Sequence, residues 1–331
     1  MESRNTRVYC VVNPARRHAD RVWQLVQDHC AALGYPPPTL LTTTIDEPGG
    51  PQATQALDVG ADLVIVAGGD GTIRNVSNVL ANSNVPMGII PTGTANIFHL
   101  NAIGKVKRLD TSVRTALLGR DIPVDTSMVR IDDADGNTST DRFLVVVGVG
   151  RDALSLGGVS DRFKKVTGPL AYFASGLPQL ARKPIPMTIE VDDQQSMKID
   201  AWSVLVGNCG VVPGKITIMP KADLADGKLN LLQVAPKSLS GWVPIAWRGL
   251  RGSDRATRGL IDADVERVVI TPHQPTAVQV DGDVFRNIAR VEIAVDPASL
   301  VIRGRESEQH DDERNGEGDS PELVGLGESP R

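Results

Sequence analysis

Two successive patterns in the sequence predict an α/β domain followed by a mostly β domain. Up to about residue 122, short apolar runs rich in β-branched residues alternate with amphipathic stretches, as in buried parallel strands and their connecting helices. From about residue 123, most segments alternate apolar and polar residues with a period of two, which is typical of half-buried strands. We therefore expect domains over 1–122 and 123–295, with a separate tail over 304–331.

The first elements are expected to be a strand, a loop and a helix. Val8–Val12 has the pattern of a strand, Asn13 opens the loop after it, and apolar residues at helical spacing follow. Leu40–Thr44 is predicted as the second strand and ends in three threonines. The hydroxyl of Thr43 could line a nucleotide site, but threonine also favours strands through β-branching alone, and the two interpretations weigh equally.

The most informative stretch lies between residues 62 and 99. Its first strand, Leu63–Ala67, is followed by five residues that allow a sharp turn: Gly68, Gly69, Asp70, Gly71 and Thr72. An amphipathic helix comes next, and a helix N-terminus presents free N–H groups to an anion, so the turn is predicted to bind phosphate. A carboxylate among phosphates needs a cation between them, which points Asp70 towards a metal ion.

A second unit of the same kind follows. Met87–Ile90 reads as a short strand, and the small residues over 91–96 lead into another helix. Loops at neighbouring strand ends form one crevice, which is where open α/β sheets bind ligands. Both could be ordinary strand–helix turns, but their pairing favours nucleotide phosphate binding.

The β domain is expected to contain the following strands: Val124–Ile131, Phe143–Val149, Met187–Val191, Ile199–Val206, Leu229–Val234, Val265–Ile270, Ala277–Val280 and Val291–Val295. Two helical excursions are expected between these strands, at 169–182 and 240–251. The tail has the composition of a disordered segment.

Charge and cysteine content exclude several classes of protein. The formal net charge is −5, but the tail holds nine acids and three bases, so the rest of the chain is close to neutral and shows no nucleic-acid-binding footprint. The three cysteines have no metal or redox spacing, which fits a reducing cytoplasm. The apolar runs are too short to be a signal peptide or to span a bilayer, so we expect a cytoplasmic protein that can still contact a membrane surface.

Three further motifs each allow more than one interpretation from their residue spacing. The stretch 148–153 matches a loose G-x-G-x-x-A pattern but lacks the later acid of a dinucleotide fold, so we interpret it as a tight turn. Asp223 and Asp226 form either a simple turn, which spacing favours, or a hard-cation site. Asp281 and Asp283 flank a glycine after a strand, and they are equally well a solvated turn or the carboxylates that accept a proton from a phosphate-acceptor hydroxyl. Neither a P-loop nor a G-x-S-x-G elbow occurs.

Taken together, these residues resemble the bacterial diacylglycerol kinase family, whose catalytic domain is shared with sphingosine and ceramide kinases. The turn 68–72 is similar to that family's phosphate loop, 88–96 to its second nucleotide loop, and 280–283 to its late Asp-Gly-Glu. The resemblance implies a Rossmann-like α/β nucleotide domain of the NAD-kinase and phosphofructokinase type, followed by a β-sandwich domain. It also implies that a last strand, at 296–303, returns to the first domain.

The resemblance further implies ATP and Mg²⁺ as cofactors. The residues expected to contact ATP are Asn13, Thr43, Gly68, Gly69, Asp70, Gly71, Thr72, Asn75, Gly93, Thr94 and Asn96. Asp70 would help to hold the catalytic Mg²⁺, Asp283 would be the general base, and Asp281 would support it. Asp223, Asp226 and the carbonyl of Lys228 match the family's structural Mg²⁺ site.

Three departures from the family pattern are visible. Arg16 and Arg17 stand where the first loop of the family usually has Ser or Ala and then Gly. Asn75 stands where many members have Glu. Asp283 replaces the Glu of the late motif and is one methylene shorter.

The lipid-facing parts are expected near the two helical excursions. The first, with Leu170, Tyr172 and Phe173, is predicted to be a wall facing acyl chains. The second, with Trp242 and Trp247, is interpreted as covering the β domain and burying its rings, although aromatic residues beside cations also suit a membrane interface.

The predicted function is an ATP- and Mg²⁺-dependent lipid kinase, with diacylglycerol as the favoured acceptor and phosphatidic acid as the product. The expected partner is a lipid substrate at the inner face of the membrane, not a nucleic acid, and a homodimer is compatible with the sequence. One alternative is a kinase of a soluble substrate such as NAD. Another is a nucleotide- or lipid-binding regulator with a weakened site.

Overall fold

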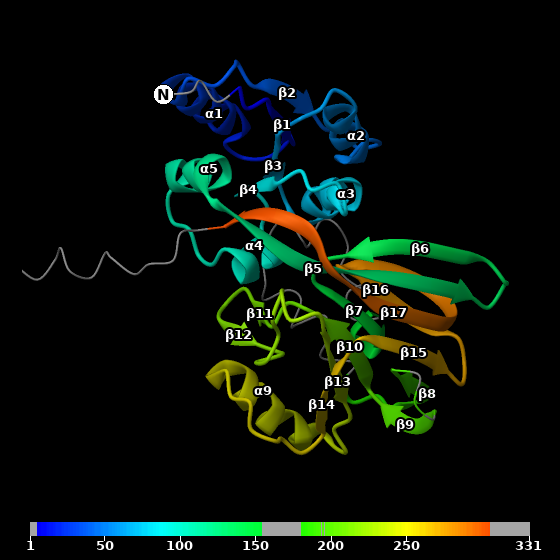
Figure 1. The fold of residues 1–331 in the computed structure, drawn as a ribbon. Coiled ribbons are helices and arrows are strands. Elements are labelled where there is room, and N and C mark those ends of the chain that lie inside the picture. Colours follow the sequence, from blue (N-terminus) through cyan, green and yellow to red (C-terminus); the bar gives the residue numbers. More distant parts are fainter. Residues whose placement is uncertain (1–4, 154–179, 193, 195, 305–331) are drawn as a thin grey trace, which may run out of the picture.

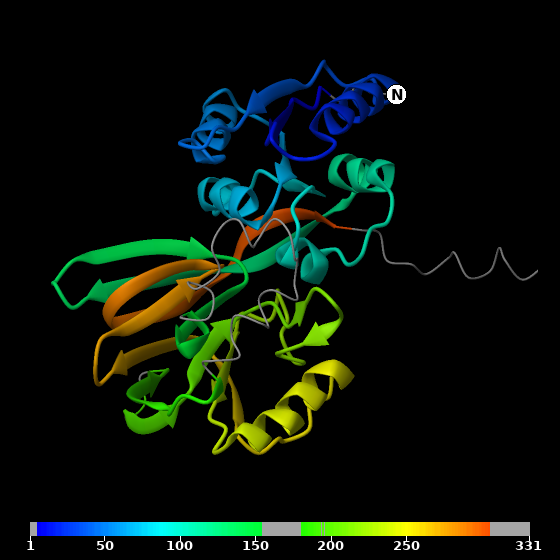
Figure 2. The same cartoon turned by 180° about the vertical axis from the view of Figure 1, so that it is seen from behind.

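The N-terminal domain is a parallel sheet between two layers of helices. The computed structural model describes residues 5–153, 180–192, 194 and 196–304, and Figures 1 and 2 show it from opposite sides. The strands are β1 Val8–Val12, β2 Thr39–Thr42, β3 Leu63–Gly68 and β4 Met87–Pro91, in the order β2-β1-β3-β4. The helices are α1 Ala19–Leu33, α2 Gly50–Asp58, α3 Asp70–Leu80, α4 Ile97–Ala102 and α5 Leu109–Leu118.

Alternating strand residues bury against opposite helix layers. Leu63 and Ile65 of β3 pack with residues of α1 and α5, whereas Val64 and Val66 pack with residues of α2, α3 and α4. Because both faces of the sheet are covered, β3 is buried along its whole length. This arrangement brings the carboxyl ends of β3 and β4 to one edge of the sheet, where the α3 and α4 helices begin.

Within the residues that the structure describes, the C-terminal domain consists of antiparallel strands, a short 3-10 helix and the helix α9. Its elements are β5 Arg120–Asp133, β6 Thr138–Phe143, β7 Val146–Gly150, β8 Ile185–Val191, β9 Met197–Ala201, β10 Ser203–Gly207, β11 Val211–Val212, β12 Ile216–Thr217, β13 Leu229–Val234, the short 3-10 helix η1 Leu239–Gly241, α9 Trp242–Arg251, β14 Leu260–Val265, β15 Arg267–Pro272, β16 Thr276–Val280 and β17 Asp283–Gly304. Its main core lies between the layers formed by these strands. With the parallel N-terminal domain, it confirms the predicted fold class.

Two long strands, β5 and β17, connect the domains. They pair with each other antiparallel along most of their length. The beginning of β17 pairs with β16, and near its end Ile302 pairs with Met87 of β4 in parallel. The β5–β17 register shifts between Asp296 and Leu300, so a bulge interrupts the ribbon at the level where it passes between the domains.

The expected strand Phe143–Val149 is wrong as a single element. The structure ends β6 at Phe143 and starts β7 at Val146, because the N–H groups of Leu144 and Val145 turn away to bond a side chain, Asp281. An apolar run does not reveal such a break, since every residue in it is compatible with a strand.

The two helical segments predicted within the β domain compare differently with the structure. Most of 169–182, including the predicted acyl-chain wall, lies outside the described residues, as does the tail beyond Gly304. The helix expected at 240–251 is confirmed as α9. Trp242 packs in the core beside Trp202, but Trp247 is 55% exposed, so the interpretation that this helix buries its rings is wrong for Trp247. The two tryptophans lie on opposite sides of the helix.

Candidate active site

The two predicted phosphate loops, 68–72 and 91–96, touch through their backbones and are called here the glycine loops. A Cβ added to Gly93 would lie 2.5 Å from the Cα of Gly69 and 2.8 Å from Oδ1 of Asn96. Thr92 N–H also donates to the carbonyl of Gly68 at 3.0 Å. Only glycine permits this approach, so the contact explains why both loops carry glycine at their closest points.

The side chain of Asp70 connects the first glycine loop to the helix that follows the second one. It is the first residue of α3, and its Oδ1 accepts a hydrogen bond from the N–H of Phe98 at the start of α4, at 3.3 Å. Burial raises the pKa of Asp70, and N–H groups of α4 oppose that shift. The carboxylate therefore sits between two helix N-termini, where negative charge is stabilised.

The other predicted ATP-contacting residues divide into three groups. Thr43 and Thr72 are buried, and the Thr72 side chain packs over Gly68, so these two offer a ligand little beyond their backbone. The side-chain amides of Asn13, Asn75 and Asn96 are hydrogen-bonded within their own loops or helix. Asn13 accepts the N–H of Ala15, Asn75 donates to the carbonyl of Gly71, and Asn96 bonds both the N–H and the carbonyl of Gly93. The exposed ones are Gly71 and Thr94, and nothing lies within 4 Å of a Cβ built on Gly71.

Arg16 lies over the first glycine loop. Its Nη2 would be 3.4 Å from a Cβ on Gly69, and the loop that carries it is closed by a bond from Arg16 N–H to the carbonyl of Asn13 at 3.1 Å. The departure from the family pattern thus places an exposed guanidinium beside the N-terminus of α3. Both features attract phosphate.

The turn over 280–283, called here the acid turn, is fixed by Asp281. This residue adopts a left-handed conformation with φ 47°, and its carboxylate accepts N–H bonds from Leu144, Val145 and Val146 at 2.9–3.0 Å. Burial raises its pKa to about 6, while these N–H groups act in the opposite direction. Asp281 therefore shapes the turn, and the exposed Asp283 carboxylate, 64% accessible, is left to face outward.

Arg74 connects the acid turn to the helix that starts at the first glycine loop. It lies one turn after Asp70 on α3, its Nη1 donates to the carbonyl of Val280 at 3.0 Å, and its Nη2 donates to Asp283. Asp141 of β6 approaches the same guanidinium at 3.9 Å. Burial lowers the pKa of Arg74, but the surrounding carboxylates outweigh burial, so the guanidinium stays charged.

Cys209 shows that the acid turn and the first glycine loop share one environment. Its thiol is buried, donates to the carbonyl of Leu144 at 3.4 Å, and has a pKa raised well above the ordinary value by burial. The charges of Asp281 and Asp70 add to that shift. Carboxylates of the acid turn and of the first glycine loop, which belong to different domains, therefore both act on this thiol.

The predicted structural cation site is a pair of tight turns. Asp223 Oδ1 accepts the N–H of Ala225, Asp226 Oδ1 accepts that of Lys228, both at 2.9 Å, and buried Asp125 takes the N–H of Gly227. Each of the two turn carboxylates keeps one oxygen outside these bonds. In the ranges that the structure describes, no three His, Cys, Asp or Glu side chains are grouped to hold a metal ion.

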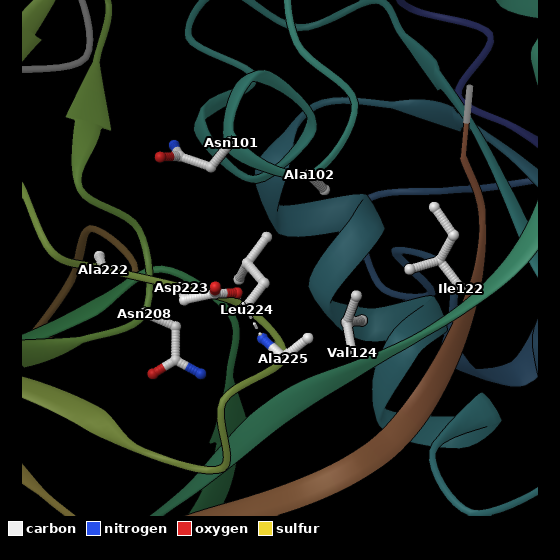
Figure 3. A pocket seen from close by; sticks show the side chains of 9 residues that line it. All are labelled: Asn101, Ala102, Ile122, Val124, Asn208, Ala222, Asp223, Leu224 and Ala225. Carbon is white, nitrogen blue, oxygen red and sulfur yellow. Dashed lines mark hydrogen bonds between the residues drawn. The ribbon is translucent and has the colours of Figure 1, made fainter. Parts of the chain in front are cut away.

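A pocket of about 340 Å³ adjoins this loop (Figure 3). It lies between α4, β5 and two loops, with Asn101, Asn208 and Asp223 as its polar lining. The Oδ1 of Asn208 is buried without a hydrogen-bond partner among the residues described. The pocket therefore has one acceptor that a bound donor would satisfy.

Reasoning from the sequence missed the bridging role of Arg74, and it missed Asp141. Arg74 could have been found by its helical spacing, because a residue four positions after Asp70 lies on the same side of the helix. Asp141 is placed only by the β5–β6 hairpin, whose register brings it to α3, where it accepts a bond from Asn78 at 3.1 Å.

Comparisons with known proteins show similarity to diacylglycerol kinases over both domains. The model of the diacylglycerol kinase catalytic domain matches residues 7–129, and that of the YegS C-terminal NAD kinase beta sandwich-like domain matches 145–303. A diacylglycerol kinase of Bacillus subtilis is 29% identical over 277 residues, which cover 81% of this chain and 84% of that protein. One of Staphylococcus saprophyticus is 31% identical over 195 residues, but the match covers only 59% of its length.

A solved structure of a diacylglycerol kinase from Bacillus anthracis shows the same fold. It superposes with a TM-score of 0.65 at 18% identity, covering 91% of this chain and 98% of that one. No helix in the described part of the chain is long and apolar enough to cross a membrane. The two family models together account for nearly the whole described chain. The chain therefore belongs to the bacterial diacylglycerol kinase family and, as a kinase of that family, it uses ATP.

Proposed function

We propose that the protein is a Mg²⁺-dependent lipid kinase that transfers the γ-phosphoryl group of ATP to the free hydroxyl of diacylglycerol, giving phosphatidic acid. The single observation that carries the proposal is the Arg74 bridge. It ties an exposed carboxylate, Asp283, to a side chain that lies one helical turn after Asp70 of the first glycine loop. Phosphoryl transfer needs little more than positioning and charge neutralisation in such an arrangement.

The glycine loops bind and orient the triphosphate. The first N–H groups of α3 have no partners within the helix and point out of its N-terminus, and the exposed Gly71 keeps that approach open. The Arg16 guanidinium lies over the same loop and adds positive charge. The contact between Gly69 and Gly93 makes the two loops one rigid cradle, so the phosphate chain meets preorganised donors.

Asp283 accepts the proton of the acceptor hydroxyl. As the hydroxyl oxygen forms its bond to the γ-phosphorus, the bond between that phosphorus and the β,γ-bridging oxygen breaks, ADP leaves, and the hydroxyl proton moves to the Asp283 carboxylate. Arg74 keeps that carboxylate in place by also gripping the Val280 carbonyl. Asp281 is engaged with three N–H groups and shapes the turn.

Asp70 is the residue that fits a Mg²⁺ ion. It is an oxygen ligand of the kind that Mg²⁺ prefers, and it lies in the first glycine loop as the first residue of α3. When bound, the ion neutralises the charge of the phosphates. We propose a second, structural Mg²⁺ at Asp223, Asp226 and the carbonyl of Lys228, for which the free carboxylate oxygens of the two turns are the support.

Incubation with γ-labelled ATP and mixed micelles containing diacylglycerol, sphingosine or phosphatidylglycerol tests the function. We expect label in the organic phase with diacylglycerol, and its loss in Asp283→Asn and Asp70→Asn. Lys198→Gln on the exposed strand β9 is the matched control and should keep wild-type activity.

Each other outcome contradicts the proposal. Label found only in a soluble acceptor would identify a kinase of a soluble substrate. Tight ATP binding with no turnover on any lipid would identify a regulator. Label in sphingosine or phosphatidylglycerol alone would overturn diacylglycerol as the acceptor while leaving a lipid kinase.

A further inference from the structure

A stripe of exposed apolar side chains runs along η1 and α9. Leu239, Val243, Trp247 and Leu250 are 61%, 69%, 55% and 62% exposed. Val243, Trp247 and Leu250 are four and three residues apart, which places them on one side of α9, and Leu239 precedes them in η1. Scattered exposed apolar residues are ordinary, but an aligned row that includes a tryptophan marks an interaction surface.

The opposite side of α9 anchors the helix firmly. Trp242 packs edge-on against Trp202 with ring centroids 4.8 Å apart, and Ile245 joins the same apolar cluster. Arg248 is buried, and its Nη2 donates to both oxygens of Asp262 at 2.9 Å. The fold therefore fixes the direction of the stripe, and the exposed residues contribute little to holding the helix in place.

The stripe is bordered by basic residues. Between residues 237 and 258 there are five bases and one acid, Asp254, in a chain whose formal net charge is −5. Arg248 is internal, whereas the other four bases are exposed: Lys237, Arg251, Arg255 and Arg258. The Arg251 guanidinium stacks on the Trp247 ring at 4.2 Å from its centroid. The surface thus combines apolar side chains with concentrated positive charge.

This combination fits an anionic lipid surface. Amphipathic helices that lie on membranes carry Trp and Leu on one face and Lys or Arg beside it, and each base near an anionic bilayer adds to the affinity. Figures 1 and 2 show α9 on the outside of the β domain, at the opposite end of the molecule from α1 and β2. A flat bilayer can approach the helix from that end.

We propose that the outer face of α9 docks on an anionic lipid bilayer, with Val243, Trp247 and Leu250 entering the interface and Lys237, Arg251 and Arg255 lying over headgroup phosphates. The inference rests on the proposed function, since a lipid kinase must meet its acceptor at a bilayer. Binding to the bilayer is a property separate from phosphoryl transfer, and it is measured without nucleotide.

Vesicle sedimentation of the full chain tests the docking surface. Wild type should bind phosphatidylcholine vesicles that contain phosphatidylglycerol far better than phosphatidylcholine alone, and added salt should weaken the binding. The double variants Val243→Ser/Trp247→Ser and Arg251→Gln/Arg255→Gln should each bind anionic vesicles at least about tenfold more weakly. Ile45→Ser, at a residue 98% exposed in the other domain, and Lys198→Gln are the matched controls and should bind as wild type does.

Several outcomes overturn the docking surface. One is equal binding of all variants to anionic vesicles, and another is equal binding of wild type to neutral and anionic vesicles. A dimer in solution that Val243→Ser/Trp247→Ser dissociates would assign the stripe to a second copy of the chain. Wild type that binds vesicles but phosphorylates no lipid would refute the proposed function and leave the surface standing. Wild type that phosphorylates lipid in micelles, with variants that still bind vesicles normally, would refute only the surface.

Discussion

The glycine loops and the acid turn are linked through Arg74, yet they are held by different means. The glycine loops are fixed by backbone contact, with Gly69 and Gly93 so close that a methyl group does not fit between them. The acid turn is fixed to the N-terminal domain by one side chain, Arg74, through two of its N–H groups. The first arrangement tolerates no added volume, whereas the second depends on the reach and shape of one guanidinium.

The largest effect is expected from breaking the backbone contact. Gly93→Ala places a Cβ 2.5 Å from the Cα of Gly69, so one of the two glycine loops must move. Overpacking of this kind costs about 3 kcal/mol, and we expect ATP binding to be lost as well. Urea unfolding and ATP titration by calorimetry measure the two effects, and unchanged values for both would show that the loops are less tightly held than the structure indicates.

The Arg74 bridge is expected to control turnover more than ATP binding. Arg74→Ala should lower kcat about 100-fold with KM for ATP nearly unchanged, because a misplaced base costs on that order and the glycine loops stay intact. Arg74→Lys should recover only part of kcat, since an ammonium cannot serve the Val280 carbonyl and Asp283 with a planar fork.

Steady-state kinetics on lipid micelles separate these outcomes. A rise in KM for ATP with normal kcat would mean that Arg74 serves nucleotide binding. In that case the acid turn would be held by its other contacts alone.

The third prediction concerns the pH dependence of stability at Asp281. Its pKa is about 6 in the folded protein and about 3.8 in the unfolded chain, so the folded state holds the extra proton between these values. Stability from this group is therefore present at low pH and is lost as pH rises through 6. Relative to Asp281→Asn, we expect the unfolding free energy of wild type to fall by about 1–3 kcal/mol between pH 4 and 7.

Urea unfolding of both proteins across that range gives the difference directly. The comparison with Asp281→Asn cancels the contributions of carboxylates that lie far from residue 281. A difference in unfolding free energy that does not change with pH would show that the pKa of Asp281 is the same in the folded and unfolded protein.

The smallest effect is expected from Gly71→Ala in the first glycine loop. Gly71 has open space around it, so Gly71→Ala should stabilise the protein by about 0.5 kcal/mol by restricting the unfolded chain. The same methyl group stands where phosphate is expected to approach, so KM for ATP should rise several-fold. Thermal unfolding and kinetics of the one variant give both numbers, and a stabilised protein with unchanged KM would move the phosphates away from Gly71.

Local patterns predicted the glycine loops and the layers of the fold. The glycine loops could be predicted because a sharp turn after a strand requires glycine. The strand β3 could be predicted because a strand covered on both faces must be apolar. The acid turn was visible as Asp-Gly-Asp after a strand, although spacing alone left its role open. All these features depend on neighbours in the sequence.

The contacts between distant segments could not be predicted in the same way. Arg74 and Asp283 are 209 residues apart, and nothing near either residue indicates the other. The break at Leu144 and Val145 exists because Asp281 needs their N–H groups, which is equally invisible in an apolar run. The exposure of Trp247 depended on which side of α9 faces the sheet, and a helix with a tryptophan on each side does not decide it by pattern.

The single strand β17 has a mechanical consequence for the two domains. It begins at Asp283 in the acid turn and ends beside β4, the strand that precedes the second glycine loop. For most of that distance it is hydrogen-bonded to β5, so a stiff two-stranded ribbon joins the two parts. Any rotation of one domain against the other would twist this ribbon. The twist would concentrate at the bulge between Asp296 and Leu300, where ladder bonds are already interrupted and Ala298 holds a left-handed conformation.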